Sequence, residues 1–405
     1  MRKIVIVSDS FKGTLDSLQI CKIAKRTSAR VIPGCETVCI PVADGGEGTV
    51  DAFVAALGAA RITCPVRGAY GVKGGALSDE PDVPAQYAIS GNTAFIEMAA
   101  AAGLPSVEGR RNPELTTTYG VGQLIADALS RGAKHILLGL GGSATCDGGC
   151  GMAAALGAVF TGIDGKSFIP TGASMRDITL INNSKTRELL SGTEITVMCD
   201  VSNPMFGEDG AAYIFAPQKG ADRDMVVRLD DGLRHLAGLI ERDLGMSVSS
   251  IPGSGAAGGM GGGCLAFLDS QLRSGIDAVL DATGFDGAIS GADLVITGEG
   301  RMDSQSLNGK VISGITSRTL KRNIPVIAIV GSVGNDLISS GALQELPFTY
   351  AGGLPAYAMP QLGISAVYST NIGRLSFEQI LASGRTPADY EKVLAIALEN
   401  AFIGK

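Results

Sequence analysis

The segment 139–151, which reads GLGGSATCDGGCG, has the composition of an anion-binding loop. Six of its thirteen residues are glycine, so the backbone N–H groups are uncovered and a ligand can approach them closely. An apolar run typical of a buried strand precedes the segment and a helix start follows it, where the helix dipole favours negative charge. The residues that we expect to bind the anion are Gly141, Gly142, Ser143, Thr145 and Asp147. Alternatively, the serine and the aspartate act only as helix caps.

Two loops near the N-terminus also place charged residues after apolar strands. The strands are predicted at residues 3–7 and 37–42. In an open parallel sheet, ligands lie at the carboxyl ends of the strands. The residues that this rule places at a cleft are Ser8, Asp9, Ser10, Lys12, Asp44, Gly45, Gly46 and Glu47. Lys12 could neutralise an anion, and Asp44 or Glu47 could bind Mg²⁺ or accept a hydroxyl proton. The alternatives are an exposed loop lysine and two helix-capping acids.

Three further segments follow the same design. Asp200 comes directly after a buried strand at 194–199. A strand at 293–297 is followed by the loop residues Glu299, Arg301 and Asp303, and then by Lys310 near a helix start. The run 253–263 is too rich in glycine for a helix interior, so we expect a backbone loop that faces a phosphate through Gly258 and Gly259. A linker is the alternative for this run.

These residue types suit phosphoryl transfer better than covalent or redox chemistry. No Walker A segment is present, and no Gly-x-Gly-x-x-Gly follows the first strand. The chain has two histidines, His135 and His235, far apart in sequence, which argues against Ser-His-Asp triads and histidine metal sites. Phosphoryl transfer depends on positioning and on charge neutralisation, which carboxylates, glycine loops and separated basic residues can provide.

The elements that must position these residues predict an α/β protein of two domains. A chain of 405 residues is too long for one ordinary core. A hairpin predicted at 85–97 interrupts the alternation of strands and helices, which returns at Asp293. We therefore expect residues 1–66 and 285–405 to form one discontinuous domain and residues 67–284 to form an inserted domain. The strand at 293–297 should then share a sheet with the strand at 3–7.

Composition excludes several classes of function. The net charge of −7 argues against a nucleic-acid or anionic-membrane partner. No apolar run approaches the roughly 18 residues of a membrane span, and the N-terminal run is too short for a signal peptide. Eight scattered cysteines without a Cys-x-x-Cys pair favour reduced thiols in a cytoplasmic protein over a disulfide framework or a zinc site.

Six ordered motifs resemble those of the bacterial glycerate kinases of the first type. They are Asp9-Ser-Phe-Lys-Gly13, Pro41-Val-Ala-Asp-Gly-Gly-Glu-Gly-Thr49, Gly139-Leu-Gly-Gly-Ser-Ala-Thr145 with Asp147-Gly-Gly149, Cys199-Asp-Val201 with Asn203-Pro204, Pro217-Gln-Lys-Gly-Ala221, and Thr297-Gly-Glu-Gly-Arg301 with Asp303. The resemblance covers essentially the whole chain. One departure is Cys146, where the family usually has asparagine; a lost hydrogen bond of this kind is worth roughly 1 kcal/mol.

The resemblance implies an enzyme that uses ATP and Mg²⁺ to phosphorylate D-glycerate at the 2-hydroxyl in glyoxylate or sugar-acid breakdown. It also implies two α/β domains, one of them discontinuous with a flavodoxin-like parallel sheet and the other an inserted mixed α/β domain, with the active site between them. Phosphorylation at the 3-hydroxyl, a nucleotide-dependent oxidoreductase acting on a small hydroxy acid, and a catalytically silent sensor are the alternatives. The chain is expected to act as a monomer or a homodimer.

Our own assignment of roles within this framework is as follows. The catalytic residues are Asp44, Lys12 and Asp200. The substrate-binding residues are Ser8, Asp9, Ser10, Gly45, Gly46, Glu47, Arg301 and Asp303. The nucleotide-binding residues are Gly141, Gly142, Ser143, Thr145, Asp147, Gly258, Gly259 and Lys310. The metal-binding residues are Asp200 and Glu299.

Overall fold

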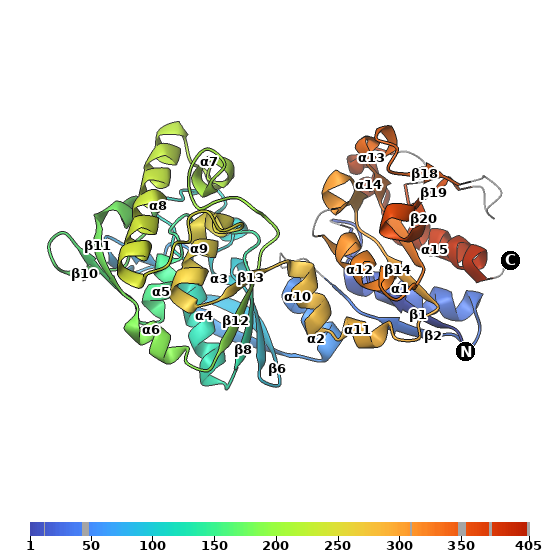
Figure 1. Cartoon of the computed structure of the whole chain (residues 1–405), viewed down its shortest axis with the longest axis horizontal. Coiled ribbons are helices and arrows are strands. Elements are labelled where there is room, and N and C mark those ends of the chain that lie inside the picture. Colours follow the sequence, from blue (N-terminus) through green and yellow to red (C-terminus); the bar gives the residue numbers. More distant parts are fainter. Residues whose placement is uncertain (12, 43–47, 308–309, 347–353, 372–374, 403–405) are drawn as a thin grey trace. The chain divides into compact units, whose positions relative to one another are not determined.

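A computed structural model of the chain describes residues 1–11, 13–42, 48–307, 310–346, 354–371 and 375–402. The chain divides into two compact units (Figure 1). The first comprises Met1–Asp44, Asp51–Leu57 and Ile276–Lys405, and the second comprises Gly45–Val50 and Gly58–Gly275. The units meet in the sequence at residues 57–58 and 275–276, rather than at the expected boundaries of 66 and 285. Strand β3 (Ala60–Val66) pairs with a strand of the second unit, whereas residues 276–284 pack with the first.

The first unit is built on a sheet of seven strands in the order β18-β19-β20-β16-β14-β1-β2. The bounds are β1 (Lys3–Ile6), β2 (Glu36–Cys39), β14 (Leu294–Thr297), β16 (Val326–Val330), β18 (Gln344–Glu345), β19 (Ala356–Met359) and β20 (Ile364–Ser369). Strands β2, β1, β14, β16 and β20 are parallel, and taken in chain order they give the flavodoxin-like sequence 2-1-3-4-5. The expected pairing of the strand near 293–297 with the first strand is confirmed, since Ile4 lies opposite Leu294.

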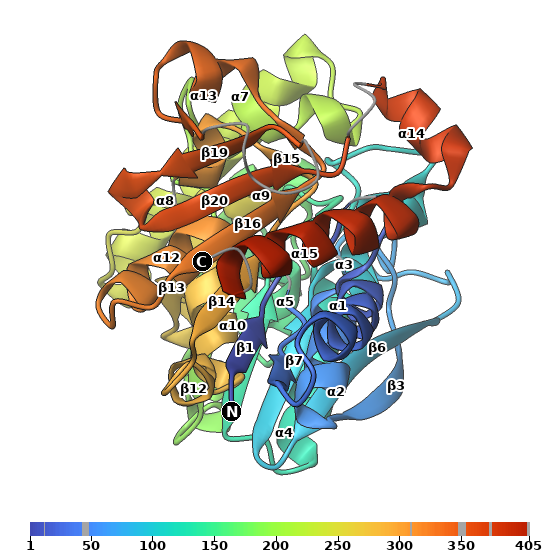
Figure 2. The same ribbon diagram turned by 90° about the vertical axis from the view of Figure 1, so that its right-hand side faces the viewer.

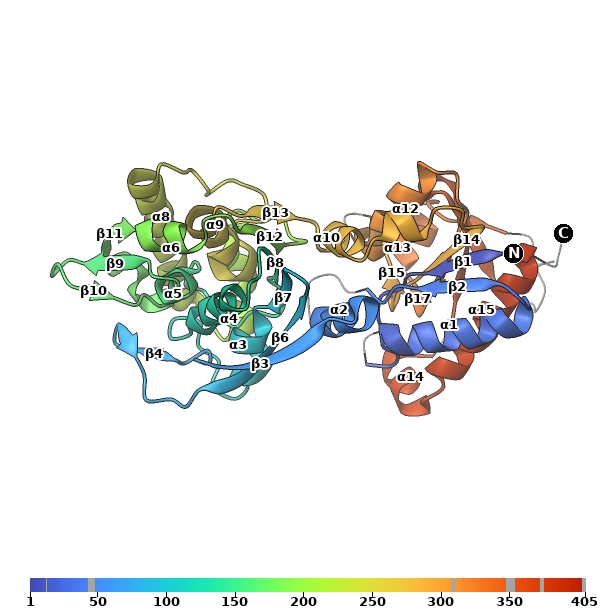
Figure 3. The ribbon, with the colours of Figure 1, turned by 90° about the horizontal axis from the view of Figure 1, so that it is seen from below.

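Helices cover both faces of this sheet. Figures 2 and 3 show α1 (Ser17–Val31) beside α15 (Thr386–Phe402) on one face and α12 (Val311–Leu320) on the other. A capping box starts α1, because Asp16 accepts the N–H of Gln19 at 2.7 Å while the Gln19 side chain accepts the N–H of Asp16 at 3.0 Å. The remaining helices are α2 (Thr49–Leu57), α10 (Gly275–Ala282), α11 (Phe285–Ala288), α13 (Asn335–Ser339) and α14 (Phe377–Ser383). Short elements complete the unit: β15 (Arg301–Met302), β17 (Ser332–Val333), and 3₁₀ turns at Ser304–Leu307 and Pro360–Leu362.

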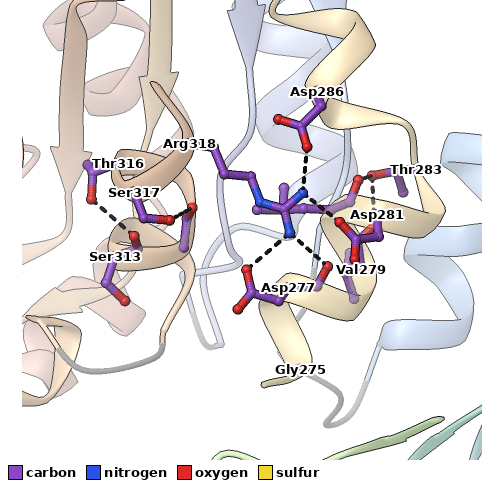
Figure 4. A network of polar contacts seen from close by, with 12 residues as sticks. Gly275, Asp277, Val279, Asp281, Thr283, Asp286, Ser313, Thr316, Ser317 and Arg318 are labelled. Carbon is purple, nitrogen blue, oxygen red and sulfur yellow. Dashed lines mark hydrogen bonds and ion pairs between the residues drawn. The ribbon is translucent and has the colours of Figure 1, made fainter. Parts of the chain in front are cut away.

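An ion-pair network fastens α12 to α10 and α11 (Figure 4). The side chain of Arg318 is only 12% exposed and points among three aspartates. It donates to Asp281 at 2.7 Å, to Asp277 at 3.0 Å and to Asp286 at 3.1 Å. Because one buried guanidinium holds three carboxylates, this network fixes the segment that follows residue 275 onto the first unit.

The second unit has a mixed sheet in the order β13-β12-β8-β7-β6-β3. Its other strands are β6 (Val83–Ser90), β7 (Thr93–Glu97), β8 (His135–Gly139), β12 (Glu194–Met198) and β13 (Gln271–Arg273). Strands β7, β8, β12 and β13 are parallel to one another, and β6 pairs antiparallel with both β7 and β3. The predicted hairpin is confirmed as β6 and β7. A small sheet, β10-β9-β11, and the pair β4-β5 are separate; their strands are β4 (Val72–Lys73), β5 (Ala76–Leu77), β9 (Val159–Gly162), β10 (Ser167–Phe168) and β11 (Ile178–Asn182).

The helices of this unit are α3 (Ala99–Ala102), α4 (Tyr119–Ser130), α5 (Cys150–Ala155), α6 (Ser184–Leu189), α7 (Ala211–Phe215), α8 (Arg223–Leu244) and α9 (Ala256–Leu268), with 3₁₀ turns at Leu104–Val107, Gly172–Asp177 and Pro217–Lys219. The run 253–263 is buried, and the expectation that it is too rich in glycine for a helix interior was wrong from residue 260 onward, where α9 is regular. A kink with positive φ at 257–259 interrupts α9. At Gly258, a Cβ would lie 2.1 Å from the carbonyl oxygen of Thr145, so close packing requires glycine there.

Two expectations about the chain as a whole can be compared with the structure. All eight cysteines are free thiols, as expected. Within the described residues, no helix is both long enough and apolar enough to span a membrane.

Candidate active site

The first unit gathers polar side chains where β1 and β14 end. The N–H of Asp9 donates to the carbonyl of Gly298 at 2.9 Å, and the Asp9 carboxylate accepts the N–H of Ser10 at 2.7 Å. A Cβ at Gly298 would lie 1.9 Å from the carbonyl oxygen of Ile329 and 3.0 Å from the Ser8 hydroxyl. The loops after these strands therefore pass in close contact. This edge is the switch point of a flavodoxin-like sheet, where such folds bind their ligands.

Glu299 is the most unusual carboxylate at this edge. It is 7% exposed, and its Oε1 has no hydrogen-bond partner among the described residues. The pKa of Glu299 is raised to about 7, chiefly by burial and also by nearby Asp9 and Asp303, whereas Ser306 and Lys310 lower it. A buried carboxylate oxygen without a partner, beside two other acids, is suited to a cation.

The described residues contain no group of three or more His, Cys, Asp or Glu side chains that could hold a metal ion by themselves. Mg²⁺ does not require one, since it usually binds one or two carboxylates together with phosphates and waters. Glu299 therefore fits a magnesium site that a phosphate-bearing substrate completes.

The other predicted residues of the first unit differ in exposure: Ser8 is buried, whereas Asp9, Ser10, Asp303 and Lys310 are half-buried. Arg301 is exposed, and its Nε lies 3.6 Å from a carboxylate oxygen of Asp303. Such a pair contributes little to stability, so both side chains can exchange partners when a ligand binds. Lys310 immediately precedes α12 and interacts electrostatically with Glu299.

In the second unit, Asp147 holds the loop after β8 from within the protein. It is fully buried and accepts hydrogen bonds from the N–H and hydroxyl of Thr118 at 2.8 and 2.9 Å. It also accepts the N–H groups of Gly149 at 3.1 Å and Gly151 at 3.2 Å. Burial raises the pKa of Asp147, and these four donors oppose the rise. Its carboxylate is thus committed to the protein's own groups, which corresponds to a structural role.

The outer part of this loop is accessible. Gly142 is exposed with φ of +74°, and Gly141 is half-buried. Ser143 is 7% exposed, and Thr145 is fully buried with a hydroxyl that has no partner among the described residues. The surface that this loop offers to a ligand therefore consists of the two glycines and the edge of Ser143.

Sequence reasoning assigned no role to two residues that organise this loop. Thr118 joins Asp147 to the start of α4, and its run of three threonines before the helix was the available signal. Helix α4 accordingly begins at Tyr119, directly after Thr118. The other residue is Lys219, which is 2% exposed. Its ammonium donates to the Ser143 hydroxyl at 2.7 Å and to the carbonyl of Thr145 at 2.8 Å.

The remaining predicted site residues of the second unit are Asp200 and two glycines of α9. Asp200 is exposed just beyond the end of β12, and its Oδ1 accepts the N–H of Gly275 at 2.8 Å. Gly258 and Gly259 are buried under the loop after β8, with Gly258 against Thr145. Packing therefore accounts for both glycines.

The predicted residues fall into three sets. Ser8, Asp9, Ser10, Glu299, Arg301, Asp303 and Lys310 belong to the first unit. Gly141, Gly142, Ser143, Thr145, Asp147, Asp200, Gly258 and Gly259 belong to the second. Lys12, Asp44, Gly45, Gly46 and Glu47 lie outside the described residues, so their assignments rest on the sequence.

The fold and these sites define an α/β enzyme of two units, with acidic and glycine-rich loops after parallel strands. The profile of the Glycerate kinase family matches residues 4–350, and the chain belongs to this family. It is 41% identical to a glycerate 2-kinase of Escherichia coli over 98% of this chain and 100% of that one. It is 47% identical to a glycerate kinase of Bacillus cereus over 82% of this chain and 85% of the relative. A solved structure of a candidate glycerate kinase 2 from Salmonella typhimurium has a TM-score of 0.83 and 38% identity, and covers 100% of this chain and 99% of that one.

Proposed function

We propose that this protein is a glycerate 2-kinase, which transfers the γ-phosphoryl group of ATP to the 2-hydroxyl of D-glycerate. The observation that carries the proposal is the 41% identity to the E. coli glycerate 2-kinase across nearly the whole of both chains. The product, 2-phosphoglycerate, places the enzyme in glyoxylate or sugar-acid breakdown. Phosphorylation at the 3-hydroxyl is the nearest alternative.

The proposed reaction forms a bond between the 2-oxygen and the γ-phosphorus as the bond to the β-phosphate oxygen breaks, and ADP leaves. A hydroxyl is a poor nucleophile, so a carboxylate must accept its proton. We assign this role to Asp44, with Glu47 and the adjacent glycines Gly45 and Gly46 orienting glycerate. Lys12 neutralises the substrate carboxylate or the transferring phosphoryl group.

The ends of β1 and β14 provide further substrate contacts. We assign these to Ser8, Asp9, Ser10, Arg301 and Asp303. Hydroxyl and guanidinium groups can bind the glycerate hydroxyl and carboxylate, and Arg301 is exposed enough to reach a ligand.

We assign nucleotide binding to Gly141, Gly142 and Ser143 of the loop after β8. Lys310 is the further residue that we assign to the nucleotide. Thr145, Asp147, Gly258 and Gly259 support that loop from beneath, a role that the hydrogen bonds and packing of this unit favour. Our candidate ligands for Mg²⁺, which would neutralise charge on the phosphates, are Glu299 and Asp200. Glu299 supports this assignment through its buried oxygen without a partner among the described residues.

The test is ADP release from ATP by the purified protein with D-glycerate, with the product identified by ³¹P NMR against 2- and 3-phosphoglycerate. We expect ADP and 2-phosphoglycerate in equal amounts, with a requirement for Mg²⁺. A second assay without ATP follows NAD(P)H absorbance with glycerate. Hydride transfer there, or 3-phosphoglycerate as the product, would reject the proposal in favour of the corresponding alternative.

We also propose that the enzyme acts in the cytoplasm on small molecules, as a monomer or a homodimer and without a nucleic-acid partner. The free cysteines and the net charge of −7 support this setting.

A further inference from the structure

Lys219 is a buried charged residue to which the reaction above assigns no role. It lies in the turn Pro217–Lys219, directly after α7. Its ammonium reaches the loop after β8, where it donates to the Ser143 hydroxyl at 2.7 Å and to the carbonyl of Thr145 at 2.8 Å. A lysine is almost never fully buried without a partner that requires its charge. Both partners here are neutral groups of the loop that we assign to the nucleotide.

The direction of the bond to Ser143 has a consequence for the hydroxyl proton. An ammonium group only donates, so the Ser143 oxygen must accept and cannot direct its own proton toward Lys219. The described residues contain no acceptor for that proton. Ser143 keeps 7% exposure and follows the exposed Gly142, so the proton can point to the surface of the loop.

The charge of Lys219 is not cancelled by direct contact with an acid in the described part of the chain. The ionisable groups that act on it through space are Cys146 and Asp147, both on the same loop. Burial raises the pKa of the Cys146 thiol to about 12, so this thiol is neutral near pH 7. The Asp147 carboxylate is engaged by four donors of its own. The loop therefore has one buried acid and one buried base beneath its outer surface, and of these two only the Lys219 ammonium contacts Ser143.

We propose that Lys219 is a positioning residue for the nucleotide: it holds the loop after β8 and makes the Ser143 hydroxyl a donor to a phosphate group. This inference rests on the proposed function, because it takes the ligand of the loop to be the polyphosphate of ATP. Lys219 acts through Ser143 and does not itself touch the ligand.

The experiment compares Lys219→Met, Ser143→Ala and the double variant in the full-length protein. Lys166→Met is the matched control, since it removes one lysine charge from a side chain that is 84% exposed. Calorimetry gives the Kd of ADP without turnover, and steady-state rates give KM for ATP and for D-glycerate. Each single change should weaken ADP binding about 10- to 100-fold, the range for a hydrogen bond that involves a charged group. The Kd of ADP for Lys166→Met should stay within about twofold of wild type, and so should the KM for glycerate in all variants.

Two results separate this role from a merely structural one. Because Lys219 acts through Ser143, the double variant should bind ADP no more weakly than the weaker of the two single variants. Burial also lowers the pKa of Lys219 to about 8, so wild-type binding of ADP should weaken as pH rises above 8. Lys219→Met should lack this dependence on pH.

Several outcomes would overturn the proposal: wild-type affinity for ADP in folded Lys219→Met, additive effects in the double variant, or a raised KM for glycerate with unchanged ADP binding. If Lys219→Met does not fold, Ser143→Ala and the wild-type pH profile still decide, and normal binding by Ser143→Ala or a flat profile would reject the idea. The two proposals fail in different ways. If the variants lose ADP binding but the wild-type protein does not phosphorylate glycerate, only the proposed substrate is wrong. If the wild-type protein phosphorylates glycerate and the variants bind ADP normally, only the role of Lys219 is wrong.

Discussion

Two buried acids illustrate how environment assigns a role to a residue type. Asp147 accepts four hydrogen bonds from protein groups and holds a loop. Glu299 has an oxygen without a partner among the described residues, and its pKa is raised to about 7. A buried polar atom without a partner is costly, so a site that retains one usually binds an ion or ligand there. The sequence shows both as acids in glycine-rich loops and does not distinguish them.

Asp44→Asn and Asp200→Asn test the two carboxylates assigned to chemistry. An amide oxygen can still accept the N–H of Gly275, so Asp200→Asn should fold normally. Neither amide accepts a proton or binds Mg²⁺ well, and we expect a loss of about 10²-fold or more in kcat for each. Asp200→Asn should also need more Mg²⁺ for half-maximal rate. Steady-state kinetics over a Mg²⁺ titration give both values, and full activity at ordinary Mg²⁺ would remove that residue from the mechanism.

Lys12→Ala tests the neutralisation of the anion beside the first strand. Losing a preorganised positive charge typically lowers the rate by about 10²–10³-fold, and we expect a loss of this size in kcat/KM. The control is Lys166→Met, which changes the net charge by the same amount at an exposed position. Near-normal kcat/KM for both glycerate and ATP in Lys12→Ala would show that this lysine is only an exposed loop residue.

Lys219 also predicts a dependence of stability on pH. The pKa of Lys219 is lowered to about 8 in the folded protein from its ordinary value of 10.5, which applies to the unfolded chain. Between these pH values, the unfolded chain therefore binds one proton more than the folded protein. The contribution of Lys219 to the free energy of unfolding therefore increases as pH rises from 8 to 10.5, by at most about 3 kcal/mol. Below pH 8 the buried charge reduces stability throughout.

Denaturant unfolding of wild type and Lys219→Met at several pH values measures this effect, because other titrations cancel in the difference. The free energy of unfolding of wild type should rise relative to the variant between pH 8 and 10.5. A difference that does not change over this range would mean that Lys219 keeps its ordinary pKa in the folded protein.

At the scale of elements, α9 and the loop after β8 form one packed assembly. The kink of α9 brings Gly258 against the carbonyl of Thr145, and the N–H of Gly148 donates to the carbonyl of Gly258 at 3.1 Å. The glycines of α9 thus serve close contact between backbones. This arrangement fixes the loop from below while its outer glycines stay accessible.

Gly258→Ala should therefore destabilise the protein more than an ordinary glycine replacement in a helix. Its φ is +70°, and its Cβ would lie 2.1 Å from a carbonyl oxygen, so strain and collision add. We expect a loss of about 2–4 kcal/mol in the free energy of unfolding. The matched control is Gly238→Ala in α8, where a Cβ meets nothing within 4 Å. That change should stabilise by up to about 1 kcal/mol. Similar free energies of unfolding for the two variants would contradict the kinked packing of α9.

Local patterns predicted those elements that depend on local signals. The apolar runs that became β1, β8, β12 and β14 and the β6–β7 hairpin are all present. Composition failed for α9, because propensity treats glycine as a helix breaker and buried packing outweighed it. Composition also did not reveal the roles of Lys219 and Thr118. These roles arise from contacts with residues that are 76 and 29 positions away, respectively. The boundary near 66 was misplaced because a single strand does not reveal which sheet it joins.

At the scale of the whole molecule, the two units differ in how the chain builds them. The first needs both ends of the chain, because β1 lies between β2 and β14 inside its sheet. The second contains an uninterrupted stretch, Gly58–Gly275, with its own sheet and a separate hydrophobic core. Residues from β3 to β13 supply every strand of that sheet.

We therefore predict that a fragment of residues 58–275 folds by itself, whereas a fragment of residues 1–57 does not. The first fragment keeps all six strands of the mixed sheet and the hydrogen bonds of Asp147 and Lys219. The second keeps only β1 and β2 as strands among its described residues, and two short strands are marginal at best in water. Circular dichroism and thermal unfolding measure this: the fragment 58–275 should unfold in one cooperative transition, and the fragment 1–57 should show none. A non-cooperative fragment 58–275 would mean that its core depends on the first unit, and the division of the chain into independent units would then be wrong.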